Sequence, residues 1–209
     1  MKVVAFIPLR NNSKRVKDKN NQVIGEKNLV QHITDRLVDV DGIDDIYLYT
    51  SDETYIEGIN KNVLLKRRCK SLDSDETKGL EIYSSFVSEI YADIYILVHA
   101  TSPFIKPETF EIGISAIRNG EYDSAFTVEE IKTFCWYDGK PINYDLDNVV
   151  QTQKLQPILV ETSGYYMFRR NVIESERRIG EKPKMVTVTH AEAIDIDEYQ
   201  DLELARRLV

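Results

Sequence analysis

The chain has 209 residues, 42% of them hydrophobic and 30% charged, an ordinary balance for one sizeable globular domain. Its formal net charge of −8 argues against broad binding to nucleic acid or to an anionic membrane surface. No apolar run approaches the ~20 residues that span a bilayer, and no signal-peptide cleavage pattern follows the short apolar run at the N-terminus. Two cysteines, Cys69 and Cys135, are too few for a disulfide framework, so we expect a cytoplasmic protein.

Over the first 120 residues, short apolar segments alternate with stretches whose apolar residues fall at helical spacing. This alternation predicts a three-layer α/β fold, with a mostly parallel sheet and helices on both faces. Ile94 to Val98 is apolar throughout, which is typical of a strand covered on both faces. Asp52 is a candidate N-cap for a short helix. The expected strands are 3–7, 46–49, 63–65 and 94–98, and the expected helices are 27–38, 54–60, 80–90 and 107–117.

The pattern changes after about residue 123, where strand-like segments follow one another with little helix between them. The stretch from Trp136 to Val160 is polar and irregular, and we interpret it as an excursion from the main sheet. We therefore expect a single domain over residues 1–209 with an arm at about 133–162. The expected strands are 124–128, 134–137, 164–168 and 185–189, and the last expected element is an amphipathic helix over 198–208.

A basic loop follows the first strand, with five cationic side chains among residues 10–20 of an otherwise acidic chain. Ligands of open α/β sheets bind at the carboxyl ends of strands, so this loop is a candidate site for polyphosphate. Asn12 suits such a loop because asparagine tolerates positive φ. A solvated surface loop is the alternative. The sequence has neither G-x-x-x-x-G-K-[ST] nor G-x-G-x-x-G, which argues against a P-loop ATPase and a dinucleotide dehydrogenase.

Two acids lie near the C-terminus, in the segment Ile194-Asp195-Ile196-Asp197. In an extended backbone Asp195 and Asp197 point to the same side, with the two isoleucines behind them. Adjacent carboxylates repel each other unless a cation lies between them. Magnesium suits this pair, because it binds one or two protein carboxylates and takes its other oxygens from water and phosphates. Alternatively, Asp197 caps the final helix and Asp195 is a surface acid.

Together these segments resemble the acylneuraminate cytidylyltransferases, also called CMP-sialic acid synthetases. That family carries A-R-x-x-S-K-x-x-x-x-K-N after its first strand, Q-P-T-S-P after its fourth, and I-D-I-D followed by a helix with a D-L pair. It also has an arginine before an S-D-T segment. The matching residues here are Arg10, Ser13, Lys14, Lys19 and Asn20, then His99 to Pro103, then Ile194 to Asp197 with Asp201-Leu202, and Arg68 before Ser74 to Thr77.

The resemblance implies a Rossmann-like nucleotide-diphospho-sugar transferase fold with a dimerisation arm. The implied reaction is attack by the anomeric hydroxyl of a 2-keto sugar acid on the α-phosphate of CTP, with Mg²⁺ as cofactor and pyrophosphate released. The implied catalytic residues are Arg10, Lys19, Asp195 and Asp197, the two aspartates being the metal ligands. The implied nucleotide-binding residues are Leu9, Arg10, Asn12, Ser13, Lys14, Lys19, Asn20, Arg68, Thr101 and Ser102.

The sugar pocket departs from the family pattern. His99 replaces a glutamine, and the family's R-x-N-G-A-I-Y reads Val160 to Tyr166 here, without its arginine and asparagine. We expect His99 and Tyr166 to contact the sugar. The family is dimeric, and its arm inserts towards the neighbouring subunit. Gln151, Gln153 and Lys154 in the arm are therefore candidates to reach a sugar across a homodimer interface. An ordinary polar loop is the alternative.

Three other functions stay open from the sequence. The same fold can act on another keto sugar acid, such as an octulosonate, pseudaminic or legionaminic acid. A non-catalytic nucleotide-binding relative is the second, although two metal carboxylates exceed what binding alone needs. A glycosyltransferase is the third, and it predicts a mid-chain Asp-x-Asp directly after the fourth strand, where this sequence reads His99 to Pro103; Asp73-Ser74-Asp75 lies before an expected helix.

Overall fold

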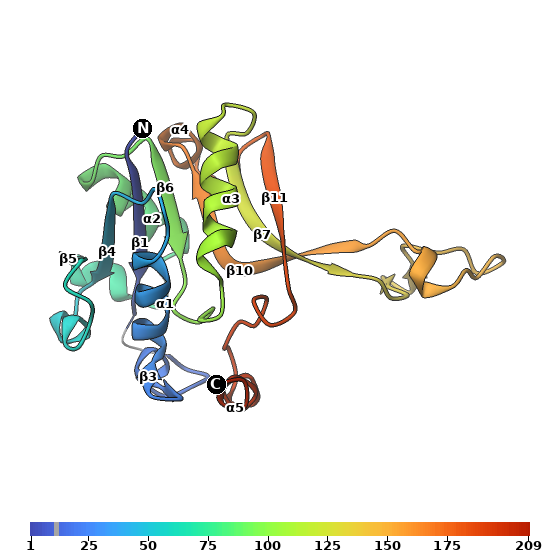
Figure 1. Ribbon diagram of the computed structural model, residues 1–209, viewed down its shortest axis with the longest axis horizontal. Helices are drawn as coiled ribbons and strands as arrows, with labels where there is room; N and C mark the ends of the chain where they lie inside the picture. The colour runs from blue at the N-terminus through green and yellow to red at the C-terminus, as the bar shows by residue number, and fades with distance from the viewer. Residues whose placement is uncertain (11–12) are drawn as a thin grey trace.

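The computed structural model describes residues 1–10 and 13–209, and it is built on one seven-stranded sheet (Figure 1). The strand order is β11-β7-β10-β6-β1-β4-β5. Neighbouring strands are parallel except for β10, which is antiparallel to both β6 and β7. The mostly parallel α/β sheet expected from the sequence is thus confirmed. The strands are β1 (Val3–Pro8), β4 (Asp45–Thr50), β5 (Val63–Arg67), β6 (Ile94–Val98), β7 (Ser124–Ile131), β10 (Ile158–Phe168) and β11 (Pro183–Val188).

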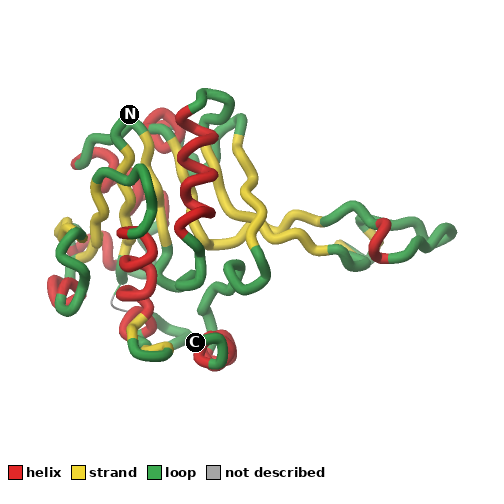
Figure 2. Tube along the Cα trace, in the orientation of Figure 1, coloured by secondary structure: helices red, strands yellow, loops and turns green. Residues whose placement is uncertain are grey.

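Helices cover both faces of the sheet, which gives the expected three layers (Figure 2). Helices α1 and α3 lie on one face, where Ile33 and Phe110 join the larger buried cluster. Helices α2 and α4 lie on the other, where Phe86 stacks on Phe6 of β1 with ring centroids 4.3 Å apart. The helices are α1 (Leu29–Val38), α2 (Gly79–Glu89), α3 (Pro107–Arg118), α4 (Arg170–Glu174) and α5 (Tyr199–Arg206).

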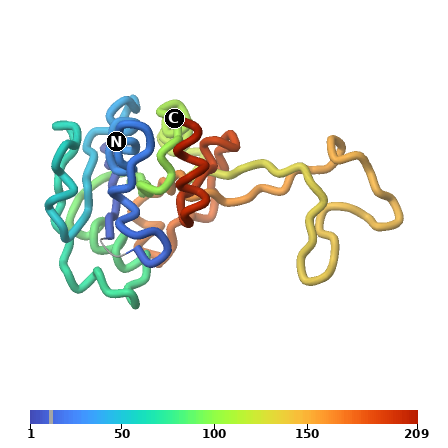
Figure 3. Tube along the Cα trace, turned by 90° about the horizontal axis from the view of Figure 1, so that it is seen from below, coloured from blue at the N-terminus to red at the C-terminus, as the bar shows by residue number. Residues whose placement is uncertain are grey.

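A third, smaller buried cluster ties the two ends of the chain together. It joins Val16 of the first loop to Ile196 and to Leu202 of α5, and all three side chains are essentially inaccessible to solvent. Burial of such side chains is worth about 1.5–3 kcal/mol each, so the cluster holds the first loop firmly against the C-terminal segment. Figure 3, which looks at this edge of the sheet from below, shows α5 beside the first loop.

The segment between β7 and β10 projects from the body as an arm (Figures 1 and 3). It contains only short elements: β8 (Trp136–Tyr137), β9 (Lys140–Pro141) and the 3-10 turn η4 (Thr152–Lys154). The ladder between β7 and β10 reaches the base of the arm, where Ile158 pairs with Ile131. Trp136 and Tyr137 are 54% and 77% exposed, so the arm carries large apolar side chains that this chain does not cover.

Local structure differs from the sequence expectation in several places: the strand expected over 134–137 is only β8, and β10 begins six residues before the expected 164. The helix expected over 54–60 is only a 3-10 turn, η2 (Glu53–Ile56), capped by Asp52 as predicted and followed by Gly58 at φ 72°. Lys27 and Asn28 form the short strand β3 against β2 (Val23–Ile24), so α1 begins two residues later than expected. Helix α4 was not expected at all. No helix among the described residues is long and apolar enough to cross a membrane.

Candidate active site

The carboxyl ends of β1 and β6 bring the first loop, the residues after β6 and the acid pair to one edge of the sheet. The C-terminal segment is fastened there by a backbone hydrogen bond from Ile196 N to Thr101 O, 2.8 Å long. Because the Ile196 side chain is fully buried, the acids on either side of it are held at the edge of the core, both partly exposed. Residues separated by more than 180 positions therefore share one site.

Asp197 is the direct meeting point of the two ends of the chain. Its Oδ1 accepts hydrogen bonds from Lys19 Nζ at 2.8 Å and from Arg15 Nη2 at 2.6 Å. Burial alone would raise the pKa of Asp197, but the hydrogen bond and charge of Lys19, together with Arg15, hold this pKa below its usual value. Asp197 is therefore an anion at neutral pH, with two cations already beside it.

Asp201 positions Asp197, a role that the sequence analysis did not assign. Its Oδ2 accepts hydrogen bonds from the backbone N–H of Asp197 at 3.0 Å and of Glu198 at 2.7 Å. Glu198, not Asp197, is the N-cap residue of α5, so the alternative interpretation of Asp197 as the cap is wrong. The aspartate of the D-L pair thus fixes the backbone of the last acid in the motif.

Asp195 supplies an available oxygen at the same edge. Its Oδ1 is buried and accepts no hydrogen bond from any described residue. A buried carboxylate oxygen without a partner is costly, which makes it a natural ligand for a cation. No group of three or more His, Cys, Asp or Glu among the described residues could hold a metal unaided. Two carboxylates nevertheless fit Mg²⁺ when a phosphate ligand provides the remaining oxygens.

The other residues of the first loop point to the segment that precedes α2. Arg10 Nη2 donates to the backbone oxygen of Thr77 at 2.7 Å, and Lys14 Nζ lies 2.7 Å from Asp75. Asn20 Nδ2 donates to the backbone oxygen of Arg10 at 2.9 Å and so braces the loop across its base. Ser13 is partly buried, and Asn12 lies outside the described residues. The loop therefore turns Arg10 and Lys14 towards the segment before α2.

Leu9 and Arg68 lie inside the protein. Arg68 is 1% exposed, and its guanidinium donates to the backbone oxygens of Leu9 and Tyr49 and to Asp73. Leu9 is equally buried, with its N–H bonded to Tyr49 O. These contacts leave Arg68 suited to holding the end of β1 in place. Beside it, past the ends of β4 and β5, is a cavity of about 690 Å³ lined in part by Ser51 and Lys70.

His99 and Ser102 follow β6, in the segment to which Ile196 is hydrogen-bonded through Thr101. Burial lowers the pKa of His99, although the carbonyl of Ser163 and the negative charge of Asp195 oppose this. Because that carbonyl can only accept, the 3.1 Å contact with His99 Nδ1 places the proton on Nδ1 and leaves Nε2 unprotonated. Ser102 is 1% exposed, and its Oγ has no hydrogen-bond partner among the described residues.

Tyr166 contacts Glu161 and Arg178, two residues to which the sequence analysis gave no role. Its ring packs edge-on against His99 at 6.2 Å between centroids, and its hydroxyl donates to Glu161 Oε1 at 2.6 Å. Arg178, from the segment between α4 and β11, lies 4.0 Å above the Tyr166 ring. Arg178 carries no local sequence signal, because it follows a five-residue helix in an irregular, charged stretch.

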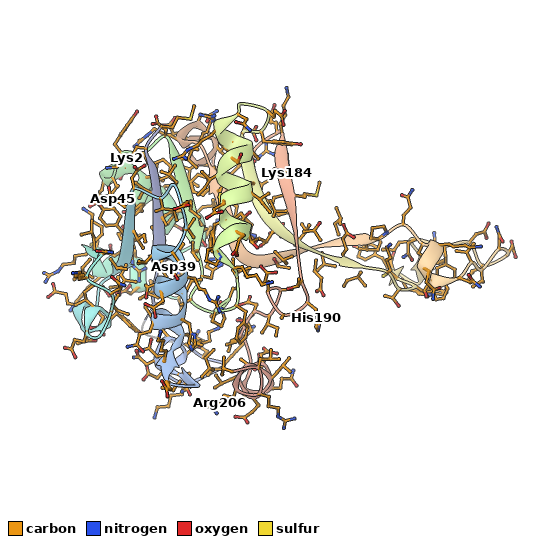
Figure 4. The ribbon with its side chains drawn as sticks, in the orientation of Figure 1. Lys2, Asp39, Asp45, Lys184, His190 and Arg206 are labelled. Atoms are coloured by element: carbon orange, nitrogen blue, oxygen red, sulfur yellow. The ribbon has the colours of Figure 1, made fainter. Side chains whose placement is uncertain are left out.

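Gln151, Gln153 and Lys154 are not brought to this site within one chain. They lie in the projecting arm, at and beside η4, away from the edge that carries His99 and the acid pair. His190, which precedes the acids in sequence, also lies apart. Its side chain is 86% exposed and pairs with Glu129 at 2.7 Å below β11 (Figure 4). A site role for the three arm residues would require a second copy of the chain.

Comparisons with known proteins bear on this site. A family model described as cytidylyltransferase matches residues 4–208. An N-acylneuraminate cytidylyltransferase from Oncorhynchus mykiss is 25% identical over 219 aligned positions, covering 99% of this chain and 50% of that protein. A 3-deoxy-manno-octulosonate cytidylyltransferase from Escherichia coli is 26% identical over 121 positions, covering 56% of this chain and 47% of that protein.

A solved structure shows the same fold over the whole chain. It is the CTP complex of a CMP:2-keto-3-deoxy-manno-octonic acid synthetase, with a TM-score of 0.73 at 20% identity. The match covers 100% of this chain and 98% of that one. By contrast, the chain spans about half the length of the curated relatives it matches.

Proposed function

Since this chain belongs to the cytidylyltransferase family, we propose that it transfers CMP from CTP to the anomeric hydroxyl of an acidic 2-keto sugar and releases pyrophosphate. The observation that carries the proposal is the direct contact of Lys19 with Asp197. It joins a cationic loop to an acid pair at the edge where open α/β sheets bind ligands. Such a site can neutralise a triphosphate and hold a divalent cation at the same point.

The residues divide the work between charge and position. Arg10, Lys14 and Lys19 would offset the triphosphate charge, with Ser13, Asn12 and Asn20 contacting phosphates or fixing the loop. Asp195 and Asp197 would hold Mg²⁺, which when bound supplies positive charge at the phosphate oxygens. His99 Nε2, kept neutral by burial, is a candidate to accept the proton of the attacking hydroxyl.

The nucleoside would lie next to the first loop. The cavity of about 690 Å³ lies past β4 and β5, beside Arg68 and Leu9. Because the Arg68 guanidinium is engaged by main-chain oxygens and Asp73, it would act by shaping this cavity. Thr101 and Ser102, after β6, are candidates for base or ribose contacts, and the free Ser102 hydroxyl supports this role.

We favour a sialic acid or related nonulosonic acid as the acceptor, with His99 and Tyr166 in its pocket. Thr101-Ser102 carries this preference, because it matches the T-S of the Q-P-T-S-P motif in the acylneuraminate cytidylyltransferases. An octulosonate is the main alternative, supported by the fold shared with the CMP:2-keto-3-deoxy-manno-octonic acid synthetase. A homodimer would bring Gln151, Gln153 and Lys154 of the arm to the partner's site, and the exposed Trp136 and Tyr137 support such an interface.

Label transfer tests the proposed reaction. The chain is incubated with Mg²⁺, CTP labelled at its α-phosphate, and N-acetylneuraminic, 3-deoxy-manno-octulosonic, pseudaminic or legionaminic acid in turn. We expect the label to enter a sugar-linked product with one pyrophosphate released per product, and mass spectrometry identifies which acid reacts. Unchanged CTP with every acid would refute the proposal, and label found only in free CMP would indicate hydrolysis.

A further inference from the structure

We propose that Arg178 binds the carboxylate of the acceptor sugar and so selects an acidic acceptor. The proposal rests on the reaction proposed above and names a residue that specifies its substrate class. Arg178 lies between α4 and β11, in a segment that belongs neither to the sequence motifs nor to the cationic loop. The geometry of its guanidinium points to this function.

The guanidinium is held in a defined position by two residues of β10. It lies 4.0 Å above the Tyr166 ring, and its Nη2 donates to Glu161 Oε1 at 2.7 Å. The same Glu161 oxygen accepts the Tyr166 hydroxyl at 2.6 Å, so one carboxylate fixes both partners. A guanidinium has five N–H donors, and Glu161 engages one edge of the fork. The stacked, preorganised fork suits two-point recognition of a planar carboxylate.

A cavity of about 350 Å³ opens beside Arg178, with room for a small anionic group. It is lined by Lys78, Gly79, Leu80, Tyr83 and Arg178. A Cβ at Gly79 would come within 2.9 Å of the Tyr83 hydroxyl, so glycine keeps space for this hydroxyl at the start of α2. The cavity thus combines a positive fork, a second cation and a phenol hydroxyl at one opening.

The surrounding charges connect this cavity to the reacting centre. Tyr83 and Arg178 line the same cavity, and the positive charges of Arg178 and Arg10 oppose the rise in the pKa of Tyr83 that burial causes. Tyr166, which lies under Arg178, packs edge-on against His99 with ring centroids 6.2 Å apart. A ligand that contacts Arg178 would therefore lie on the side of the site that carries His99.

The anion is better matched by a carboxylate than by the triphosphate. Lys19 and Lys14 are paired with Asp197 and Asp75, whereas Arg178 is held on β10 by Glu161 and Tyr166. Arg178 also has Glu161 beside it, and this negative charge disfavours a highly charged phosphate more than a singly charged carboxylate.

The experiment compares each acceptor acid with its methyl ester, using N-acetylneuraminic and 3-deoxy-manno-octulosonic acids. We measure kcat/KM for the acid and the ester, and KM for CTP, in the unaltered chain, Arg178→Met and Arg178→Lys. Arg206→Met is the matched control, since Arg206 pairs with Glu203 at 2.6 Å at the surface of α5 (Figure 4). Thermal melting shows whether each variant is folded. If Arg178→Met does not fold, the comparison rests on Arg178→Lys.

We expect Arg178→Met to lower the acid-to-ester ratio of kcat/KM by about tenfold or more, with KM for CTP unchanged. The lysine variant should fall between, because it keeps the charge and loses the fork. An unchanged ratio would overturn the proposal, and a rise in KM for CTP instead would assign Arg178 to the triphosphate. If the unaltered chain turns over neither acid, the proposed reaction fails for these acceptors. Calorimetric titration with the same acids then decides on Arg178: binding lost in Arg178→Met supports it, and equal or absent binding overturns it.

Discussion

Replacing Lys19 by methionine removes the cation that links the first loop to the acid pair. The Lys19 side chain is only 14% exposed, and its Nζ lies 2.8 Å from Asp197 Oδ1. A unit charge ~4 Å from a phosphate oxygen, at an effective dielectric of about 20, contributes about 4 kcal/mol. Arg15 stays beside Asp197 in the variant and offsets part of the loss. We therefore expect kcat/KM for CTP to fall about a hundredfold, equivalent to ~3 kcal/mol.

The same substitution should shift the pH dependence. Lys19 helps to hold the pKa of Asp197 below its usual value, so without it Asp197 takes up a proton at a higher pH. The acidic limb of the activity profile should consequently move to higher pH in Lys19→Met. Stability should change by less than about 1 kcal/mol, because Asp197 is more than a third exposed and keeps Arg15.

The assay is pyrophosphate release, with kcat and KM for CTP measured between pH 4 and 9. Lys27→Met is the control, since Lys27 pairs with Asp35 at 2.7 Å on the surface, away from the acid pair. Urea denaturation of each variant separates loss of activity from loss of folding. A Lys19→Met enzyme with unchanged kcat/KM and an unmoved acidic limb would refute the assignment of Lys19 to the triphosphate.

Asp195→Asn should lower kcat about a hundredfold or more and weaken the dependence of rate on Mg²⁺ concentration, measured by metal titration; an unaltered titration would contradict the metal assignment. Glu192→Gln should destabilise the chain by about 2 kcal/mol at pH 7, because the 4% exposed Glu192 carboxylate accepts hydrogen bonds from Thr109 and Thr189. Burial would raise the pKa of Glu192, but these bonds lower it, so the stability is present above the unfolded pKa of about 4.3 and is lost as pH falls through the folded pKa. Urea melts of the two proteins should therefore converge at low pH, and a constant difference would contradict this. Replacing Trp136 and Tyr137 by serine should convert a dimer to a monomer in light scattering, and a monomeric unaltered chain would contradict the proposed interface.

The main sheet was predictable because its signal is local. Apolar runs such as Ile94–Val98 are fully buried strands, as their composition indicated. Pro107 begins α3 at the position where its missing N–H costs nothing. The 54–60 segment was misassigned because its polar residues support one capped turn and Gly58 then adopts positive φ. Helix propensity alone could not show that the segment would end after a single turn.

The candidate site was predictable only where its residues lie in contiguous motifs. The acid pair and the loop cations each form a contiguous stretch of sequence, and the rule for open α/β sheets placed the loop at the carboxyl end of the first strand. Arg178 and Glu161 meet through tertiary packing alone, since 17 residues and helix α4 separate them. Likewise, nothing local showed that Arg68 would be buried beneath Leu9, or that Asp201 would fix the backbone of Asp197.

The most direct measurement is a crystal structure of the chain with CTP and Mn²⁺, in which anomalous scattering locates the metal. We predict one manganese site bound by Asp195 and Asp197 and by phosphate oxygens of CTP, with Lys19 and Arg10 contacting the same triphosphate. A triphosphate bound away from these cations, or manganese bound without either aspartate, would contradict a shared site for the two ends of the chain.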